Sequence, residues 1–282
     1  MMNIVDKYYK LEAIIKGMEH VVVAFSGGVD SAFLLKVSTD ILGKSAYGIL
    51  AVSPTFPSRE LKKARDFAKY IGAHLEIIET KEMENEDFIN NPVNRCYFCK
   101  SELFEKILEI AGTKTYPNLI DGSNMDDLGD HRPGRKALKE KGVRSPLQEA
   151  ELNKKEIREL SRRLGLPVWN KEALACLSSR FPYGEKINLE KLRMVDEIEN
   201  FLQDLGFTHI RARHIDKTLK IEINSDEINL FLRDIIRNKV VKKAKELGYL
   251  YVTLDLEGYR QGSLNATIDK IPQSEEIRMS DV

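Results

Sequence analysis

The chain has 282 residues, of which 42% are hydrophobic, so it can bury one large core or a large core and a smaller one. Its 44 basic and 44 acidic side chains cancel, which disfavours nucleic acid or an anionic membrane as a partner. No segment has the length and hydrophobicity of a membrane span or a secretory leader, and three cysteines are too few for a disulfide scaffold, so we expect a cytoplasmic protein with reduced thiols.

Predicted strands and helices alternate in the first part of the chain. Strands are expected at 21–25, 47–53, 74–80 and 118–123, and helices at 31–42, 58–72 and 95–111. This alternation predicts an α/β fold with a doubly wound parallel sheet, covered by helices on both faces. Ligands of such sheets bind in the loops that follow the strands.

The pattern changes after Tyr183. Helices are expected at 188–206 and 225–248, and strands at 209–215, 219–224 and 249–256. We therefore expect two domains, 1–183 with the parallel sheet and 184–282 as a smaller α+β unit in ferredoxin-like order.

A glycine-rich loop, SGGVDS, joins the first strand to the helix that follows it. Its predicted ligand residues are Ser26, Gly27, Gly28, Asp30 and Ser31. Glycines let backbone amides point at one anion, and the start of the next helix adds positive charge, so the loop predicts a phosphate cradle. It is neither a Walker loop nor a dinucleotide fingerprint. Asp30 would repel phosphate unless it binds Mg²⁺ or caps the helix.

These residues resemble the PP-loop signature of the ATP pyrophosphatase superfamily, an adenine nucleotide alpha hydrolase-like fold. Its members split ATP between the α and β phosphates to adenylate a substrate. The resemblance implies ATP and Mg²⁺ as cofactors, pyrophosphate on the loop and Asp30 in catalysis. It places adenine near Ala51 and Ser53, at the end of the second strand.

Three further stretches carry a narrower resemblance. They are NRCYFCKSELF at 94–104, DGSNMDDLGDHRPGRKAL at 121–138 and ACLSSRFPYG at 175–184, with RARH following at 211–214. In this order they resemble the LarE family of sulfur transferases. The resemblance implies a small-molecule substrate, pyridinium-3,5-biscarboxylic acid mononucleotide, whose carboxylates are adenylated and converted to thiocarboxylates for the nickel-pincer nucleotide. It also implies a homo-oligomer, because the family tends to form rings of subunits.

The cysteines leave the source of sulfur open. One branch of the family has a single cysteine, in the position of Cys176, which surrenders its own sulfur. This chain adds Cys96 and Cys99, a chelating or redox spacing at a helix start. Three thiolates with no histidine nearby suit a [4Fe-4S] cluster with one open iron better than zinc. The resemblance then implies that a sulfide on this iron attacks the acyl-adenylate. A sacrificial Cys176, a zinc site and a redox dithiol remain alternatives.

Polar residues after the fourth strand are candidate ligands of Mg²⁺ or the nucleotide. They are Asp121, Ser123, Asn124 and Asp126, with Arg132 and Arg135 as candidates for the phosphates or the adenylate. Asx-turn chemistry explains the first group equally simply.

Three arginines are predicted to bind the substrate. Arg180 follows Cys176 by one helical turn and matches the family's phosphate ligand. Arg211 and Arg213 lie two apart and so point to one face of a strand, where they offer paired guanidinium groups to the mononucleotide phosphate. A solvated strand face fits the same pattern. Glu199 and Glu222 correspond loosely to acidic residues near that site.

Three other functions fit parts of the sequence. A PP-loop enzyme that 2-thiolates tRNA also uses cysteines, but the balanced charge and the lack of an aromatic and basic surface disfavour it. An amide-forming synthetase would need no cysteines. A non-enzymatic nucleotide sensor would keep the loop and the cysteines but would release no pyrophosphate.

Overall fold

The computed structural model describes residues 2–113, 118–129, 138, 140–172, 175–260 and 263. Contacts divide the chain into two compact units. Unit 1 is Met1–Ile89 with Asn94–Cys176, and unit 2 is Asn90–Val93 with Leu177–Val282. The division thus falls a few residues before the boundary predicted at Tyr183. Among the described residues, no helix is long and apolar enough to cross a membrane.

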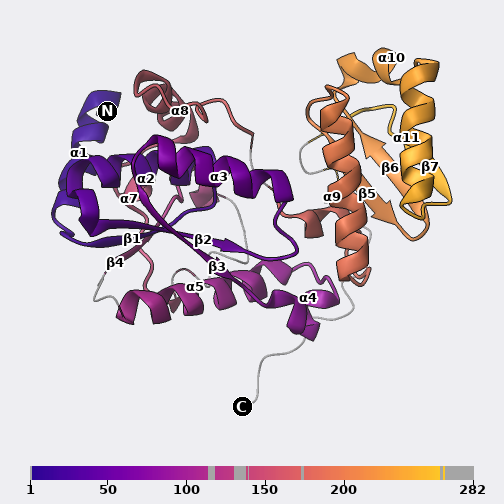
Figure 1. Cartoon of the computed structure of the whole chain (residues 1–282). Helices are drawn as coiled ribbons and strands as arrows, with labels where there is room; N and C mark the ends of the chain where they lie inside the picture. The colour runs from indigo at the N-terminus through magenta and orange to yellow at the C-terminus, as the bar shows by residue number, and fades with distance from the viewer. Residues whose placement is uncertain are drawn as a thin grey trace. The chain divides into compact units, whose positions relative to one another are not determined.

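A four-stranded parallel sheet forms the centre of unit 1 (Figure 1). Its strands are β1 (Val21–Ala24), β2 (Ala46–Val52), β3 (His74–Glu79) and β4 (Asn118–Asp121), in the order β3-β2-β1-β4. The chain extends the sheet to one side through β2 and β3 and then returns to the other side of β1 with β4. The carboxyl ends of β1 and β4 therefore flank the switch point at which open α/β sheets bind ligands. The predicted α/β fold with a parallel sheet is confirmed.

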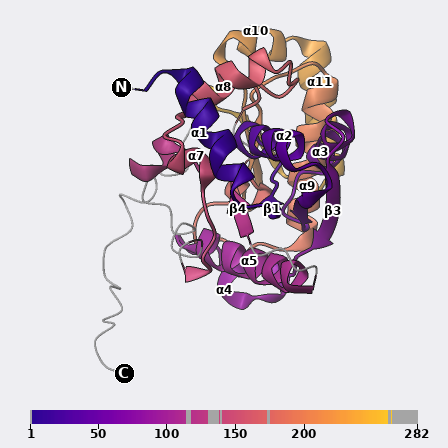
Figure 2. The same cartoon turned by 90° about the vertical axis from the view of Figure 1, so that its left-hand side faces the viewer.

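Helices cover both faces of this sheet because β1 is apolar on both sides. Val21 and Val23 pack in one core with α1 (Ile4–Lys16), α2 (Val29–Leu42), α3 (Ser58–Tyr70) and α8 (Lys154–Arg163), whereas Val22 packs in a second core with α5 (Arg95–Thr113). Figure 2 shows α1 and α2 above the strands and α5 below them. The other described helices of unit 1 are α4 (Glu86–Ile89) and α7 (Pro146–Glu149), with the short 3₁₀ turns η1 (Gly43–Ser45), η2 (Glu82–Glu84) and η3 (Met125–Gly129).

Gly122 lets the end of β4 approach the start of α2. A Cβ atom at this position would lie 2.8 Å from the backbone nitrogen of Ser31 and 3.0 Å from its Cα. Backbone atoms cannot move aside as a flexible side chain can, so only glycine allows this contact. It brings the loop after β4 beside the glycine-rich loop after β1.

Unit 2 contains a three-stranded sheet with helices packed on it (Figure 1). Its elements are η4 (Leu177–Arg180), α9 (Leu189–Asp204), β5 (Arg211–Ile215), β6 (Thr218–Glu222), η5 (Ser225–Glu227), α10 (Ile228–Phe231), α11 (Asp234–Glu246) and β7 (Tyr251–Leu254). The strand order is β5-β6-β7, with β5 antiparallel and β7 parallel to β6. The predicted order of a helix, two strands, a helical segment and a strand is therefore observed, although the described part of unit 2 lacks the fourth strand of a ferredoxin-like sheet and pairs β7 directly with β6.

The single helix predicted at 225–248 is wrong, because the helical segment is interrupted between α10 and α11. Phe231 and Val240 are both buried in the core of unit 2. On one straight helix, nine residues at about 100° each would place them on opposite sides. Arg233 takes an extended conformation (φ −59°, ψ 135°), and this break lets both side chains face the same core.

A buried histidine lies in this core. His214 is 3% exposed, and its Nδ1 lies 3.1 Å from the hydroxyl oxygen of Tyr249. Its ring also packs against Phe181, with the centroids 5.4 Å apart. Nε2 lies 3.5 Å from a carboxylate oxygen of Glu185 but lacks hydrogen-bond geometry. Burial lowers the pKa of His214, although the negative charge of Glu185 opposes the shift.

We expect the free energy of unfolding to fall as the pH drops below about 6.5, the pKa of histidine in an unfolded chain. The reason is that the unfolded state then binds a proton that buried His214 does not bind. Urea titrations at about pH 7.5 and 5.5 should show a smaller difference between the two pH values in His214→Phe than in the wild type. His74→Asn, at an exposed histidine of β3, serves as the control. Equal pH slopes in wild type and His214→Phe would contradict this prediction.

Candidate active site

Two serine hydroxyl groups form hydrogen bonds within the loop between β1 and α2. Gly27 has a φ of 75°, in the left-handed region that glycine adopts without strain. The Oγ of Ser31 accepts a hydrogen bond from the Ser26 backbone nitrogen at 3.2 Å and lies 3.0 Å from the Ser26 Oγ. Gly28 precedes the first turn of α2, and no side chain caps that turn among the described residues. The first amides of α2 can therefore receive an anion.

Asp30 supplies the negative charge of this loop. One carboxylate oxygen, Oδ2, accepts a hydrogen bond from Nζ of Lys154, at the start of α8. The other, Oδ1, is buried and has no hydrogen-bond partner among the described residues. Burial raises the pKa of Asp30, while Lys154 acts in the opposite direction. A buried carboxylate oxygen without a partner, beside a phosphate cradle, suits Mg²⁺, which prefers oxygen ligands.

The polar side chains after β4 hold their own loop together. Asp121 accepts hydrogen bonds from the hydroxyl groups of Ser123 and Ser145, the second at 2.6 Å. Asp126 accepts a hydrogen bond from the backbone nitrogen of Lys154 at 2.9 Å. Their predicted roles with ATP or Mg²⁺ remain predictions. Two further predicted nucleotide ligands, Arg132 and Arg135, lie outside the described residues.

A buried carboxylate lies beside the segment predicted to hold adenine. Ser53, which follows β2 and the predicted adenine neighbour Ala51, donates a hydrogen bond to Oε1 of Glu82. Thr55 donates to the same oxygen at 3.0 Å. Glu82 is 2% exposed, and its Oε2 has no hydrogen-bond partner among the described residues. The sequence does not distinguish Glu82, because it lies in a polar, acidic stretch typical of a surface loop.

The three cysteines lie in one neighbourhood of unit 1. Cys96 and Cys99 belong to the first turn of α5, and Cys176 ends the unit. None of the three forms a disulfide. Burial raises the pKa of Cys99 well above its usual value, and the charges of Glu82, Cys176 and Cys96 raise it further. Cys176 is thus near enough to the helical pair for their charges to interact.

The donors at this place suit an iron–sulfur cluster in kind. Three thiols can supply the soft ligands that such clusters require. The raised pKa of Cys99 means that its thiol must lose a proton before it can bind a metal. Across the described residues, no three histidine, cysteine or carboxylate side chains are arranged to hold a metal ion. The three thiols are therefore of the right kind and lie in the same region for a cluster, but in this structure their sulfur atoms are not positioned to hold a metal ion together.

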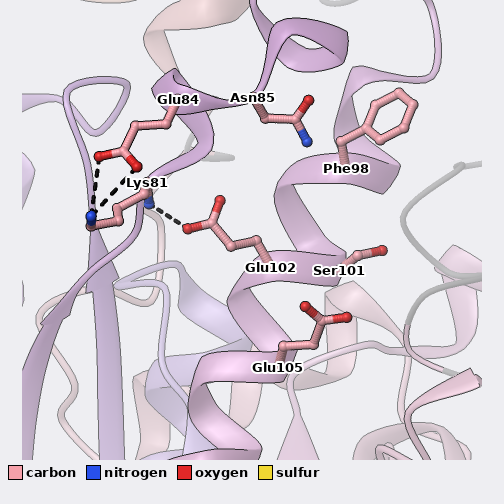
Figure 3. A pocket seen from close by; sticks show the side chains of 7 residues that line it. All are labelled: Lys81, Glu84, Asn85, Phe98, Ser101, Glu102 and Glu105. Carbon is pink, nitrogen blue, oxygen red and sulfur yellow. Dashed lines mark hydrogen bonds and ion pairs between the residues drawn. The ribbon is translucent and has the colours of Figure 1, made fainter.

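A separate depression of the surface lies beside α5 (Figure 3). It is lined by Lys81, Glu84, Asn85, Phe98, Ser101, Glu102 and Glu105. Lys81 pairs through Nζ with Glu84 at 3.2 Å, and its backbone nitrogen donates to Glu102. Glu105 pairs with Lys141 at 2.8 Å. Its three carboxylates are all paired within the protein, and it contains none of the predicted site residues.

Two of the predicted substrate arginines form buried ion pairs within unit 2. Arg180 donates from Nε and Nη2 to the carboxylate of Glu199 at 2.9 and 2.7 Å. Arg213 donates in the same way to Glu222 at 3.1 and 2.8 Å, and from Nη1 to the carbonyl oxygen of Ser179 at 2.6 Å. Each pair is bidentate and largely shielded from water, so its two charges balance.

Arg211 differs from these two arginines. Its guanidinium group lies over the ring of Tyr259, 4.8 Å from the centroid, and donates to the carbonyl oxygen of Ile210 at 2.7 Å. No salt bridge joins it to a carboxylate of the described residues. Burial lowers the pKa of Arg211 and the positive charge of Arg180 lowers it further, whereas the negative charge of Glu199 opposes the shift. Arg211 therefore leaves this part of unit 2 with a positive charge that an anion could balance.

Two lysines near the glycine-rich loop were not predicted from the sequence. Lys154 contacts Asp30, and Lys171 donates a hydrogen bond from Nζ to the carbonyl oxygen of Gly27 at 2.7 Å. Lys171 also forms an ion pair with Glu60 at 2.6 Å. Both lysines are more than 120 residues away from the loop in sequence, and only the fold brings them to it. No local motif marks them.

Comparisons with known proteins place this chain among PP-loop enzymes. The profile of the NAD synthase family matches residues 3–91, which include the glycine-rich loop. An uncharacterized protein of Synechocystis is 45% identical over 265 residues, covering 94% of this chain and 99% of that protein. The pyridinium-3,5-bisthiocarboxylic acid mononucleotide synthase of Lactiplantibacillus plantarum is 35% identical over 271 residues, covering 96% of this chain and 98% of the synthase. An uncharacterized protein of Methanocaldococcus jannaschii is 32% identical over 242 residues, covering 85% of this chain and 90% of that protein.

Proposed function

The chain belongs to the LarE family of sulfurtransferases, and from this we propose that it uses ATP to convert the carboxylates of pyridinium-3,5-biscarboxylic acid mononucleotide to thiocarboxylates. The observation that carries the proposal is the glycine-rich loop with Asp30 at the switch point of the sheet, in a chain that matches a synthase of this product along nearly its whole length. The loop and the sheet support a nucleotide site, and the product named for the relative supports the choice of the molecule that is adenylated.

The first step that we propose is adenylation. A carboxylate oxygen of the substrate attacks the α phosphorus of ATP, and pyrophosphate leaves with the electron pair of the broken bond. The amides of the loop at Gly27 and Gly28 and the start of α2 would bind the pyrophosphate, and Oδ1 of Asp30 would bind Mg²⁺. Product analysis tests this step. AMP and pyrophosphate should form only when the carboxylate substrate is present, whereas ADP and phosphate would contradict the proposal.

For the second step, we propose that Cys96, Cys99 and Cys176 hold a [4Fe-4S] cluster with one iron free of protein ligands. The bound cluster would supply the sulfide that displaces AMP. The support is the grouping of the three thiols, in which Cys99 is half-buried and the charges of Cys96 and Cys176 act on it. The family branch with a single cysteine offers the competing route, in which Cys176 gives up its own sulfur.

We propose that unit 2 binds the phosphate of the mononucleotide, with Arg211 as the principal charge. Arg180 and Arg213 already balance Glu199 and Glu222, so they shape the site and add hydrogen-bond donors, whereas Arg211 forms no ion pair with a carboxylate of the described residues. Binding of a phosphate would relieve the repulsion between Arg211 and Arg180 that contributes to the lowered pKa of Arg211.

Replacing Arg211 by glutamine should raise the KM for the mononucleotide by about ten- to a hundredfold, the value of one lost charge-assisted contact. ATP binding and the melting temperature should stay near the wild-type values, because within the described part of the chain the side chain contacts the ring of Tyr259 and a backbone oxygen rather than a carboxylate. Arg213→Ala should instead lower the melting temperature, since it leaves Glu222 buried without its partner. Arg237→Gln, at an exposed arginine of α11, is the matched control. A loss of ATP affinity with an unchanged KM for the mononucleotide would contradict the assignment.

We also propose that the protein acts in the cytoplasm as a homo-oligomer. Reactive thiols need a reducing compartment. Unit 2 exposes several large apolar side chains, among them Leu232, Ile235, Leu250, Tyr251 and Leu256, which a second copy could cover. Light scattering of the purified protein tests the oligomeric state, and a monomer at all concentrations would contradict it.

A further inference from the structure

Lys171 reaches the glycine-rich loop from a segment far away in the sequence. Its Nζ lies 2.7 Å from the carbonyl oxygen of Gly27 and 2.6 Å from Oε2 of Glu60. Its side chain is 18% exposed and that of Glu60 is 12% exposed, so the ammonium group is partly shielded from water. A Cβ atom added to Gly27 would lie 3.9 Å from this Nζ, which places the charge at the wall of the phosphate cradle.

We propose that Lys171 is a catalytic residue of the adenylation step, and that it binds and neutralises the departing pyrophosphate. The inference rests on the proposed function, because it needs ATP to be cleaved between the α and β phosphates. The bond from the α phosphorus to the bridging oxygen breaks, and the new negative charge stays on the pyrophosphate. In a Walker loop, a lysine inside the motif neutralises the charge of the phosphates. Here a lysine that lies beside the loop, but outside its sequence motif, would have the same role.

The surroundings of Lys171 allow it to change partners. Glu60 also pairs with Lys63 at 2.8 Å, so it keeps a cation when Lys171 turns to a phosphate. Burial raises the pKa of Glu60, but the contacts with the two cationic groups of Lys171 and Lys63 outweigh burial, so the net shift is downward. The contact of Lys171 with Oε2 of Glu60 is an ion pair without hydrogen-bond geometry, whereas its bond to Gly27 is directional. The loop carbonyl thus holds the ammonium group in place, and Glu60 can release it.

The other lysine at the loop has a different role. Lys154 forms an ion pair with the carboxylate of Asp30. In the described part of the chain, no other lysine or arginine pairs with this carboxylate. Moving Lys154 to a phosphate would leave Asp30 buried without its partner, at a high cost in free energy. Lys154 therefore balances Asp30, and Lys171 is the lysine that can follow the pyrophosphate.

The test compares Lys171→Gln and Lys171→Arg with two other variants of unit 1. Lys7→Gln is the matched control, because Lys7 pairs with Glu156 at 2.7 Å and its side chain is 14% exposed. Glu60→Gln removes the negative charge that pairs with Lys171 and leaves the positive charge of Lys171 in place. Calorimetry with inorganic pyrophosphate and Mg²⁺ gives the affinity, and rapid quench gives the rate of pyrophosphate formation in a single turnover, because adenylation releases pyrophosphate and leaves AMP on the substrate.

We expect Lys171→Gln to lower both the pyrophosphate affinity and the rate of pyrophosphate formation by about a hundredfold. Lys171→Arg should recover part of the loss, and Lys7→Gln should match the wild type. Glu60→Gln should bind pyrophosphate at least as tightly as the wild type, even if Lys171→Gln proves unstable. Wild-type affinity in Lys171→Gln, or a loss in Glu60→Gln as large as that in Lys171→Gln, would overturn the inference. A wild type that neither binds pyrophosphate nor forms it from ATP would overturn the proposed function as well.

Discussion

Replacing Cys99 by alanine is expected to abolish sulfur transfer and to remove the bound iron. Cys99 is the thiol whose pKa is raised by the charges of both Cys96 and Cys176, so it lies near both of them. Without it, the two remaining thiolates are too few to hold such a cluster. Wild-type protein purified without oxygen should be brown and contain about four irons per chain, a number set by the cluster type. Iron and sulfide analysis and the absorption spectrum of Cys99→Ala should be near background. Ser101→Ala, on the same helix, is the control.

The same experiment distinguishes the two sources of sulfur. Cys96→Ala and Cys176→Ala should behave like Cys99→Ala if the three thiols hold one cluster. If Cys176 is sacrificed instead, Cys96→Ala should stay active for one turnover, and intact-mass spectrometry should show that Cys176 has lost the mass of H₂S. That result would contradict the cluster and leave Cys96 and Cys99 without a role in catalysis.

Replacing Asp30 by asparagine is expected to lower the rate of adenylation by about a hundredfold or more. The change keeps the shape of the side chain but removes the charge at Oδ1, the buried oxygen that we assign to Mg²⁺ and that no described residue hydrogen-bonds. Lys154 loses its counterion at the same time, so the melting temperature must be measured alongside the rate.

Asp40→Asn provides the matched control for this substitution. Asp40 lies on the same helix, α2, and pairs with Lys36, but it is far along the helix from the loop. AMP formation in Asp40→Asn should equal that of the wild type. If Asp30→Asn keeps the wild-type dependence of the rate on Mg²⁺ concentration, Asp30 is not the metal ligand.

The sheet of unit 1 and its glycine-rich loop follow from local sequence. Short β-branched runs such as Val21–Ala24 alternate with amphipathic helices, and this periodicity is enough to predict a parallel sheet. The loop carries its own signature, because two glycines and two serines between a strand and a helix suit few other purposes. These predictions needed no knowledge of which distant segments meet.

The remaining site residues depend on those distant contacts. Lys171 and Glu60 reach the loop only through the packing of α3 and of the segment after α8, and no motif identifies them. The Arg-x-Arg pattern could not separate Arg211 from Arg213 either. Their difference lies in Glu222, which is across the sheet on β6 and opposite Arg211 in register, yet binds Arg213.

The break between α10 and α11 shows a limit of a different kind. Propensity and charge at 225–248 favour one continuous helix. The core overrides them, because Phe231 and Val240 can both be buried only if the chain turns at Arg233. Tertiary packing of this kind cannot be deduced from one amphipathic pattern.

The most direct test of the proposed function is the product itself. Wild-type protein, kept free of oxygen, would be incubated with ATP, Mg²⁺, sulfide and an excess of pyridinium-3,5-biscarboxylic acid mononucleotide, and the nucleotide would be followed by mass spectrometry. We predict that sulfur replaces one oxygen of each carboxylate, that each replacement is matched by one AMP, and that product accumulates beyond one per chain while Cys176 stays intact. An unchanged mononucleotide, with ATP untouched or cleaved to ADP, would contradict the account.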